Sequence, residues 1–347
     1  MRFSILTTLF LFFTFHITCQ SQNNAKTKSN DLYKGVLSEK INGLSFVAPR
    51  KPISELAMQE VQSVNANWIA VIPYAFSPND KPELRFHSDG TGMWGETPNG
   101  VQICIDSAHK KGIKVMIKPQ VWIRNGWTGG MDYATHDDWV KWEEGYEKYI
   151  LTFAEVAEKA KADMLCIGTE FKTSTTKREA FWRSLIKKVR AVYSGKLTYA
   201  SNWDEYMLVP FWDALDIVGI DAYFSLCQKE TPSVSELKTA WKPVVETLKK
   251  FQQRIKKPVV FTEYGYLDTD GCAYNSWEIE KRLNTVNINQ QGQANGIEAL
   301  LTVFSKEHWW HGGFMWKWYP ESRKRDKDYS PQGKMAEKVL RDMYSKK

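Results

Sequence analysis

The sequence of 347 residues lacks the closely spaced cysteine and histidine pairs of a zinc site, because its five cysteines give no such signature. It also lacks a strong charge of one sign. The net charge of +7 comes from lysines scattered over amphipathic patterns, whereas nucleic-acid-binding surfaces gather basic residues into one patch or stripe. We therefore expect no metal site and no nucleic-acid partner.

Long apolar runs are absent except near the N-terminus, where residues 5–17 are too few for an ordinary membrane span. Residues 1–19 therefore indicate a secretory signal peptide, and residues 20–38 a polar tether. We expect an exported protein that is periplasmic, extracellular or lipid-anchored at the bacterial outer membrane. Lipidation of Cys19 would be its only membrane attachment, and plain export remains the alternative because His16 is atypical of a lipoprotein signal.

A Pro/Gly/Ser-rich linker is also lacking after the N-terminal segment, so we expect one domain over residues 39–347.

Cys104 and Cys166 lie in a predicted helix and strand and should be buried, free thiols. Cys227 and Cys272 each follow a predicted strand, in neighbouring loops. Export would permit a disulfide between them, and two free thiols are the alternative.

Eight apolar runs alternate with helical patterns, which predicts an α/β protein built as a single (β/α)8 TIM barrel. The runs are continuously apolar, as expected for parallel strands covered on both faces. The predicted strands are 43–47, 68–74, 114–120, 164–170, 197–202, 217–223, 259–263 and 312–318. The predicted helices are 53–65, 98–111, 138–161, 175–193, 204–213, 234–254, 276–307 and 331–345.

Two glutamates, Glu170 and Glu263, stand at the downstream ends of separate predicted strands. In a parallel barrel both would point into one cleft at the carboxyl ends of the strands. A retaining glycosidase needs such a pair, about 5 Å apart, as nucleophile and acid/base. The alternative for either residue alone is a helix-capping or ion-paired carboxylate.

The surroundings of the two glutamates suggest which one has which role. Tyr223 ends the strand next to that of Glu263, and a hydrogen bond from its phenol would favour the ionised form of a nucleophile. Glu170 would then be the acid/base. Its pKa should rise while Glu263 is negative and fall once a glycosyl ester neutralises that charge.

Other polar and aromatic residues at strand ends are candidates for sugar binding by hydrogen bonds or ring stacking. Trp316 and Trp318 should face the same way because side chains alternate along a strand, and Trp316 is the better candidate for the floor of the site. Lys118 can instead pair with Asp221, and Asn202 can instead form a turn or cap. The full set of candidates is Trp316, Asn202, Trp203, Lys118, Gln120, Trp122, Tyr74 and Thr169.

Four motifs together resemble glycoside hydrolase family 113 of clan A over residues 40–345: IGTE (167–170), VGIDAY (218–223), VVFTEYGY (259–266) and GFMWKW (313–318). The resemblance implies a retaining (β/α)8 enzyme, chiefly an endo-β-1,4-mannanase. It implies Glu170 as acid/base, Glu263 as nucleophile, Tyr223 as the residue that positions the nucleophile and Trp316 as the platform of subsite −1.

One position departs from the clan. Many members have asparagine immediately before the acid/base, where it contacts the sugar 2-hydroxyl, and here that residue is Thr169. Because mannose differs from glucose at this carbon, the sugar preference stays open.

We expect a cofactor-independent retaining hydrolase of a poly- or oligosaccharide, most of all β-1,4-mannan. The alternatives are the same mechanism on another β-glycan, such as glucan or galactan, and a non-catalytic glycan-binding barrel.

Overall fold

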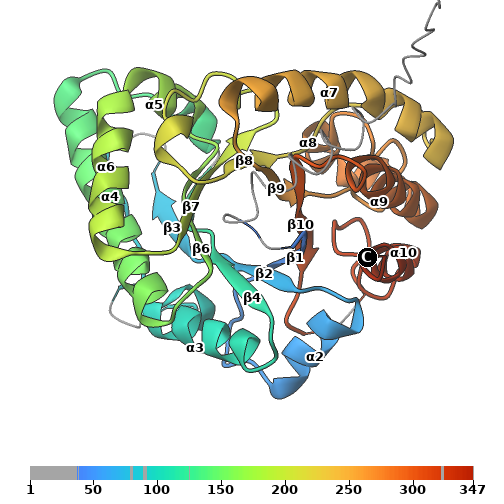
Figure 1. The fold of residues 1–347 in the computed structure, drawn as a ribbon, viewed down its shortest axis with the longest axis horizontal. Helices are drawn as coiled ribbons and strands as arrows, with labels where there is room; N and C mark the ends of the chain where they lie inside the picture. The colour runs from blue at the N-terminus through green and yellow to red at the C-terminus, as the bar shows by residue number, and fades with distance from the viewer. Residues whose placement is uncertain are drawn as a thin grey trace, which may run out of the picture.

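The computed structural model describes residues 37, 39–78, 81–88, 92–124, 126–321 and 324–346. The predicted signal peptide and Cys19 lie outside these residues. Eight parallel strands close into a barrel in the order β1-β10-β9-β8-β7-β6-β4-β2, with helices in a ring around them (Figure 1). The predicted (β/α)8 barrel is therefore confirmed. The strands are β1 Ile41–Phe46, β2 Trp68–Val71, β4 Lys114–Ile117, β6 Met164–Thr169, β7 Lys196–Asn202, β8 Val218–Asp221, β9 Val259–Tyr264 and β10 Trp310–Trp318.

The helices bury one apolar face each against the outside of the barrel, and several begin at capping side chains. Thr97 accepts a hydrogen bond from the Gly100 amide at 3.0 Å, and Ser233 forms a capping box with Glu236. Among the described residues, no helix has the length and apolar character needed to cross a membrane. The α-helices are α2 Glu55–Ser63, α3 Pro98–His109, α4 His136–Lys159, α5 Lys172–Lys177, α6 Glu179–Val192, α7 Val234–Ile255, α8 Ser276–Glu280, α9 Gln290–Phe304 and α10 Met335–Tyr344.

Two of the predicted helices are wrong. Residues 204–213 form turns and the start of a short 3-10 helix, because the Glu205 side chain accepts the Asn202 amide and Pro210 cannot donate to a helical ladder. The predicted helix 276–307 is divided into α8, a 3-10 turn at Leu283–Thr285 and α9. Asn289 ends the connection by capping α9, with its side chain accepting the Gly292 amide at 2.8 Å.

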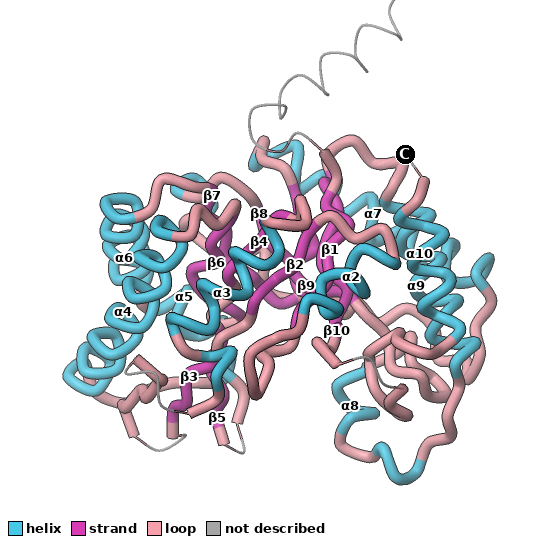
Figure 2. Tube along the Cα trace, turned by 90° about the horizontal axis from the view of Figure 1, so that it is seen from below, coloured by secondary structure: helices cyan, strands magenta, loops and turns pink. Residues whose placement is uncertain are grey.

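A separate pair of parallel strands, β3 Tyr74–Ser77 and β5 Gln120–Ile123, extends beyond the barrel. Pro73 and Pro119 divide them from β2 and β4, because proline has no amide hydrogen to continue a ladder. Figure 2 shows β3 and β5 at the same end of the molecule as α8. These elements, which follow the carboxyl ends of barrel strands, therefore surround one end of the barrel.

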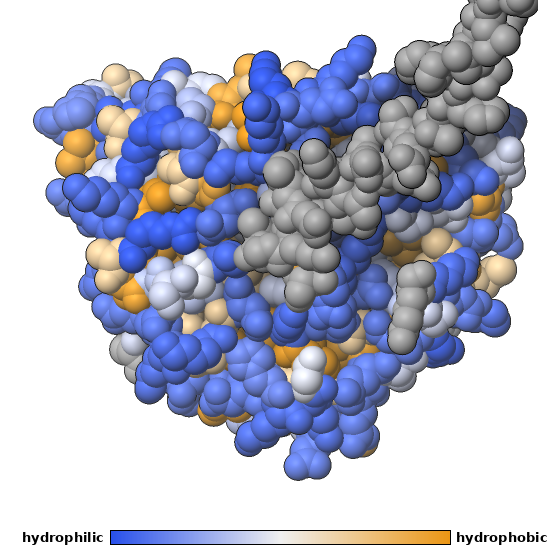
Figure 3. Space-filling model, viewed as in Figure 1, coloured by the Kyte–Doolittle hydropathy of each residue, from blue (hydrophilic) through white to orange (hydrophobic). Residues whose placement is uncertain are grey.

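The surface agrees with the scattered charge of the sequence. On the face seen in Figure 3, hydrophilic residues predominate and apolar residues occur in small separate groups among them. The apolar side chains lie instead in two clusters, one inside the barrel and one between barrel and helices.

Candidate active site

A cavity of about 880 Å³ lies at the carboxyl ends of the barrel strands. Both strand-end glutamates line it, and so does every other predicted site residue except Lys118. The sequence therefore predicted the location of the cleft from the polarity of the strand ends. The predicted residues in the lining are Tyr74, Gln120, Trp122, Thr169, Glu170, Asn202, Trp203, Tyr223, Glu263 and Trp316.

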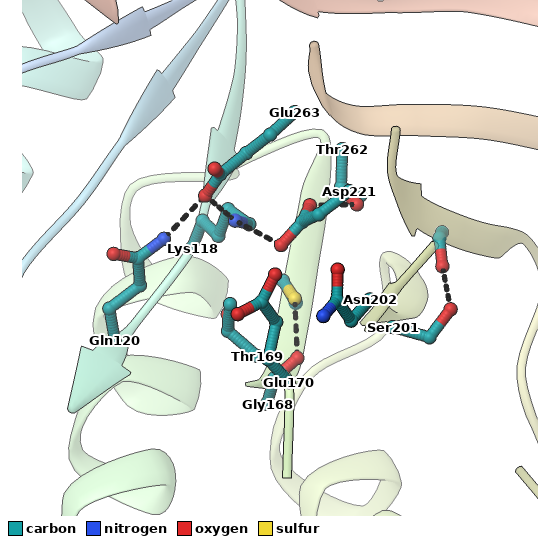
Figure 4. Close-up of polar contacts among 12 residues, drawn as sticks. Lys118, Gln120, Gly168, Thr169, Glu170, Ser201, Asn202, Asp221, Thr262 and Glu263 are labelled. Atoms are coloured by element: carbon teal, nitrogen blue, oxygen red, sulfur yellow. Dashed lines mark hydrogen bonds and ion pairs between the residues drawn. The ribbon is translucent and has the colours of Figure 1, made fainter. Parts of the chain in front are cut away.

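Glu263 is held on β9 by three donors. Its Oε1 accepts a hydrogen bond from Gln120 Nε2 at 2.7 Å and is in contact with Lys118 Nζ (Figure 4). Its Oε2 accepts the Tyr223 hydroxyl at 2.8 Å. Hydrogen bonds and a cation favour the ionised form of a carboxyl group, and they also fix its orientation. Glu263 is therefore in the environment that a carboxylate nucleophile requires.

Lys118 lies beneath Glu263, and the expectation that it contacts substrate is wrong because its side chain is completely buried. The alternative, pairing with Asp221, is the observed one: Nζ lies 3.3 Å from Oδ2 of Asp221. Burial acts to lower the pKa of Lys118, but the charges of Asp221 and Glu263 raise it above its ordinary value. Burial, followed by the charge of Glu263, raises the pKa of Asp221. Thr262 donates to the other oxygen of Asp221 at 2.7 Å.

Replacing Lys118 by methionine should lower the free energy of unfolding by about 3–5 kcal/mol, because it leaves two buried carboxyl groups without their cation. Urea unfolding followed by circular dichroism measures the change. The matched control is Lys172→Met, which removes a half-exposed ion pair to Asp204 and should cost about 1 kcal/mol or less. Equal losses in the two variants would contradict the role of Lys118 as the compensating charge.

Glu170 has a different environment from Glu263. It follows β6 with a left-handed backbone (φ 57°), and its amide donates to the carbonyl of Ala200 at 2.8 Å. Its Oε2 accepts a hydrogen bond from Trp127 Nε1 at 2.8 Å. Burial, reinforced by the charge of Glu263, raises the pKa of Glu170 to about 7. Figure 4 shows its side chain directed toward the space beneath Glu263.

Two carboxyl groups with opposed environments therefore face one cavity. Glu263 has a cation and two neutral donors, whereas Glu170 has one donor and a pKa raised to about 7. With its raised pKa, Glu170 can be protonated near neutral pH beside a second carboxyl group whose contacts suit a carboxylate. Such a pair can donate a proton to a leaving oxygen while the second carboxylate attacks carbon.

Aromatic side chains surround the pair. Trp122, which is 55% exposed, packs against Phe76 of the β3–β5 pair with 5.6 Å between ring centroids and the rings tilted by 35°. Trp203 stacks on Trp277 of α8 at 5.5 Å with an interplanar angle of 21°. Exposed ring faces of this kind suit contact with the apolar faces of sugars.

Thr169 and Asn202 lie in the cavity wall, and Asn202 also forms the turn that was its alternative assignment. The Asn202 side-chain oxygen accepts the Trp203 amide at 2.9 Å. The Thr169 hydroxyl has no hydrogen-bond partner among the described residues, although the residue is 8% exposed. Thr169 lines the cavity, but its hydroxyl oxygen is buried.

Among the cavity-lining residues that sequence reasoning missed are Trp127, Trp277, Glu280 and Tyr329. All four lie in connections that follow strands, and Tyr329 packs edge-on against Tyr223 at 5.9 Å. The three aromatic residues have one signal in the sequence, the frequency of aromatic residues in the segments that follow strands, and Glu280 on α8 lacks that signal. That signal does not tell which ring turns inward.

The expectation that Trp316 and Trp318 share a face is wrong. Leu44 of β1 pairs with Met315, but Phe46 pairs with Trp318, so β10 contains one extra residue between these positions. A bulge of this kind reverses the alternation beyond it. Trp316 therefore lines the cavity, whereas Trp318 is 2% exposed in the core between barrel and helices.

The predicted disulfide is also wrong, although its two loops are neighbours. The Leu226 amide donates to the Ala273 carbonyl at 2.8 Å, but Cys227 and Cys272 are both free thiols. Cys272 turns inward, where its sulfur packs beside Gly292 of α9, while Cys227 is only half-buried. The prediction of two buried, free thiols at Cys104 and Cys166 is confirmed.

Comparison with known proteins gives one family and one fold. The model of Glycoside Hydrolase Family 113 matches residues 49–334. A family 113 β-mannanase from Alicyclobacillus acidocaldarius, solved in complex with ManMIm, is 24% identical, with 88% of this chain and 97% of that chain covered and a TM-score of 0.77. A second structure, of a family 113 β-1,4-mannanase, is 25% identical over 89% of this chain and 100% of that chain, with a TM-score of 0.74.

More distant structures have the same barrel. The β-glucuronidase from Ruminococcus gnavus is 12% identical, with a TM-score of 0.60, over 88% of this chain and 50% of that chain. A search of curated proteins gave no match. At these identities the structural likeness is evidence for the fold alone.

Proposed function

Because the chain belongs to glycoside hydrolase family 113, we propose that it hydrolyses a β-linked poly- or oligosaccharide with retention, and that the substrate is β-1,4-mannan. The observation that carries the proposal is the contrast between Glu263, held by a cation and two neutral donors, and Glu170, with its raised pKa, in one cavity. Retaining hydrolysis needs this division between an ionised nucleophile and a protonated acid.

In the first step, a carboxylate oxygen of Glu263 attacks the anomeric carbon and the bond to the leaving oxygen breaks. Glu170 gives its proton to that oxygen, so the products are a free alcohol and a glycosyl ester of Glu263. The ester carries no charge. One of the causes that raise the pKa of Glu170 is then removed, so Glu170 stays ionised and can accept a proton in the next step.

In the second step, Glu170 takes a proton from water while the water oxygen attacks the anomeric carbon. The ester bond breaks, Glu263 leaves as a carboxylate, and Glu170 is again protonated. Two inversions at the same carbon give net retention. Glu263 is held in place by its contacts with Lys118, Gln120 and Tyr223.

The choice of mannan rests on the solved structures of family 113, which are described as β-mannanases. The aromatic rings that line the cavity, among them Trp122, Trp203 and Trp277, suit a chain of several sugars rather than a single one. We further propose, from residues 1–19, that the enzyme is exported to meet such a polymer outside the cytoplasm, with or without a lipid on Cys19.

Product analysis on a panel of β-mannan, glucomannan, galactomannan, cellulose, xylan and β-galactan tests the proposal. We expect oligosaccharides from the mannans alone, and no products from any member with Glu263→Ala prepared in parallel. Products from another glycan with none from mannan would instead support the same mechanism on that glycan. Binding to a glycan without products from any would favour a non-catalytic barrel.

A further inference from the structure

Glu205 is a buried carboxyl group that the proposed mechanism does not use. It lies in the turn after β7 and is 1% exposed. Its Oε1 accepts the Asn202 amide at 2.9 Å and the Tyr199 hydroxyl at 3.3 Å. Its Oε2 has no hydrogen-bond partner among the described residues. A buried carboxyl oxygen without a hydrogen bond lowers the stability of the folded protein, so its presence calls for a functional explanation.

A chain of hydrogen bonds joins Glu205 to the segment that carries Glu170. The Tyr199 hydroxyl donates to Glu205 and accepts the amide of Phe171 at 2.7 Å. Phe171 directly follows Glu170, whose own amide donates to the carbonyl of Ala200. Residues of β7 therefore hold the backbone on both sides of Glu170, which has the left-handed conformation that few non-glycine residues adopt.

Glu205 also acts on Glu170 through its charge. Burial raises the pKa of Glu205 to about 7, although its two hydrogen bonds act in the opposite direction. The other charged groups that act on it are Asp204 and Asp221. When ionised, Glu205 raises the pKa of Glu170 in the same direction as the charge of Glu263 does.

The remaining neighbours of Glu170 act in the opposite direction. The hydrogen bond from Trp127 and the cation of Lys118 favour its carboxylate form. The protonation of the acid/base therefore depends on a balance of charges and hydrogen bonds. Glu205 contributes to this balance from outside the cavity lining, and hydrogen bonds through Tyr199 connect it to the Glu170 segment.

We propose that Glu205 is a positioning residue for the acid/base step, which fixes the Glu170 segment through Tyr199 and favours the protonated form of Glu170 by its negative charge. This inference rests on the proposed function, because it assigns the acid role to Glu170. Glu205 itself does not touch substrate.

The test is the pH profile of kcat/KM for Glu205→Gln on the β-mannan or other glycan that the wild type cleaves. Glutamine keeps the acceptor oxygen for Asn202 and Tyr199 but removes the charge. The pKa of Glu170 should then fall. As pH rises, the activity of the variant should therefore begin to decline at a lower pH than that of the wild type. We expect the basic limb of the profile to move to lower pH by roughly half a unit or more.

A merely structural role would lower activity equally at every pH and leave the limb in place, and that result would overturn the inference. An aryl glycoside with a good leaving group is the control, because its first step needs no proton from Glu170. Its profile should move less than that of the glycan. Absence of glycan hydrolysis by the wild type would contradict the proposed function instead, so the two failures are distinguishable.

Tyr199→Phe provides a second variant should Glu205→Gln fail to fold. It removes the hydroxyl that lowers the pKa of Glu205, so Glu205 carries less negative charge at a given pH. The basic limb should again move to lower pH, by a smaller amount. An unmoved limb in the folded variant would likewise overturn the inference.

Discussion

Replacement of Glu263 by alanine should lower kcat on the glycan substrate by roughly 10⁵-fold or more, because no other group can form the glycosyl ester. The fold should survive. Lys118 keeps Asp221 as its buried ion-pair partner when Glu263 is removed, so the variant is not left with an uncompensated cation. The measurement is product release by the purified variant, with its circular dichroism spectrum compared with that of the wild type.

A second readout identifies the lost group as the nucleophile. With azide and an activated β-glycoside, Glu263→Ala should give the α-glycosyl azide, since a small anion in the vacated space attacks the anomeric carbon once. Glu278→Ala is the matched control, because this glutamate on α8 is exposed and forms a surface ion pair with Lys281 at 2.8 Å. A β-glycosyl azide, or glycan hydrolysis at the wild-type rate, would contradict the assignment of Glu263.

The barrel was predictable because its strands are apolar on both faces and its helices are amphipathic. Their alternation along the chain indicates the topology without knowledge of any contact. The predicted ends of the strands were less accurate than the predicted topology. Pro73 and Pro119 signal the interruptions that separate β3 and β5, but nothing in the sequence shows that the two segments pair again beyond the barrel.

The candidate site was predictable where strand polarity alone decides position, as for Glu170, Glu263 and Tyr223. It was not predictable where burial decides, as for Lys118. A lysine at a strand end is exposed in most proteins, and only the closed barrel shows that two carboxyl groups meet it in the interior. Glu205 was missed because the predicted helix over 204–213 placed it on a helix rather than in a turn.

Contacts made by loops could not be predicted. Trp127 reaches Glu170 from the long connection after β5, and Tyr329 reaches Tyr223 from the connection after β10. Loop paths depend on tertiary contacts that have no periodic signal in the chain. The aromatic composition indicated that rings would line the cleft but did not indicate which rings.

Replacement of Glu170 by alanine should lower kcat on the unactivated glycan by about 10²–10⁴-fold, because the leaving alcohol then departs without a proton. An aryl glycoside with a good leaving group needs no such proton, so its first step should be spared. The second step should be slow, because no base remains for water. A burst of aryl alcohol followed by a slow steady rate should therefore appear in stopped-flow measurements.

The pH profile and azide then separate the acid role from a structural one. Glu170 must be protonated to act, and its pKa is raised to about 7, so wild-type activity on the glycan should fall as pH rises through about 7. The variant should lack this basic limb. Azide attacks the ester without a base, so it should restore turnover of the aryl glycoside and give the β-glycosyl azide, the opposite anomer to that expected from Glu263→Ala. Equal losses on activated and unactivated substrates, with no rescue by azide, would contradict an acid/base role for Glu170.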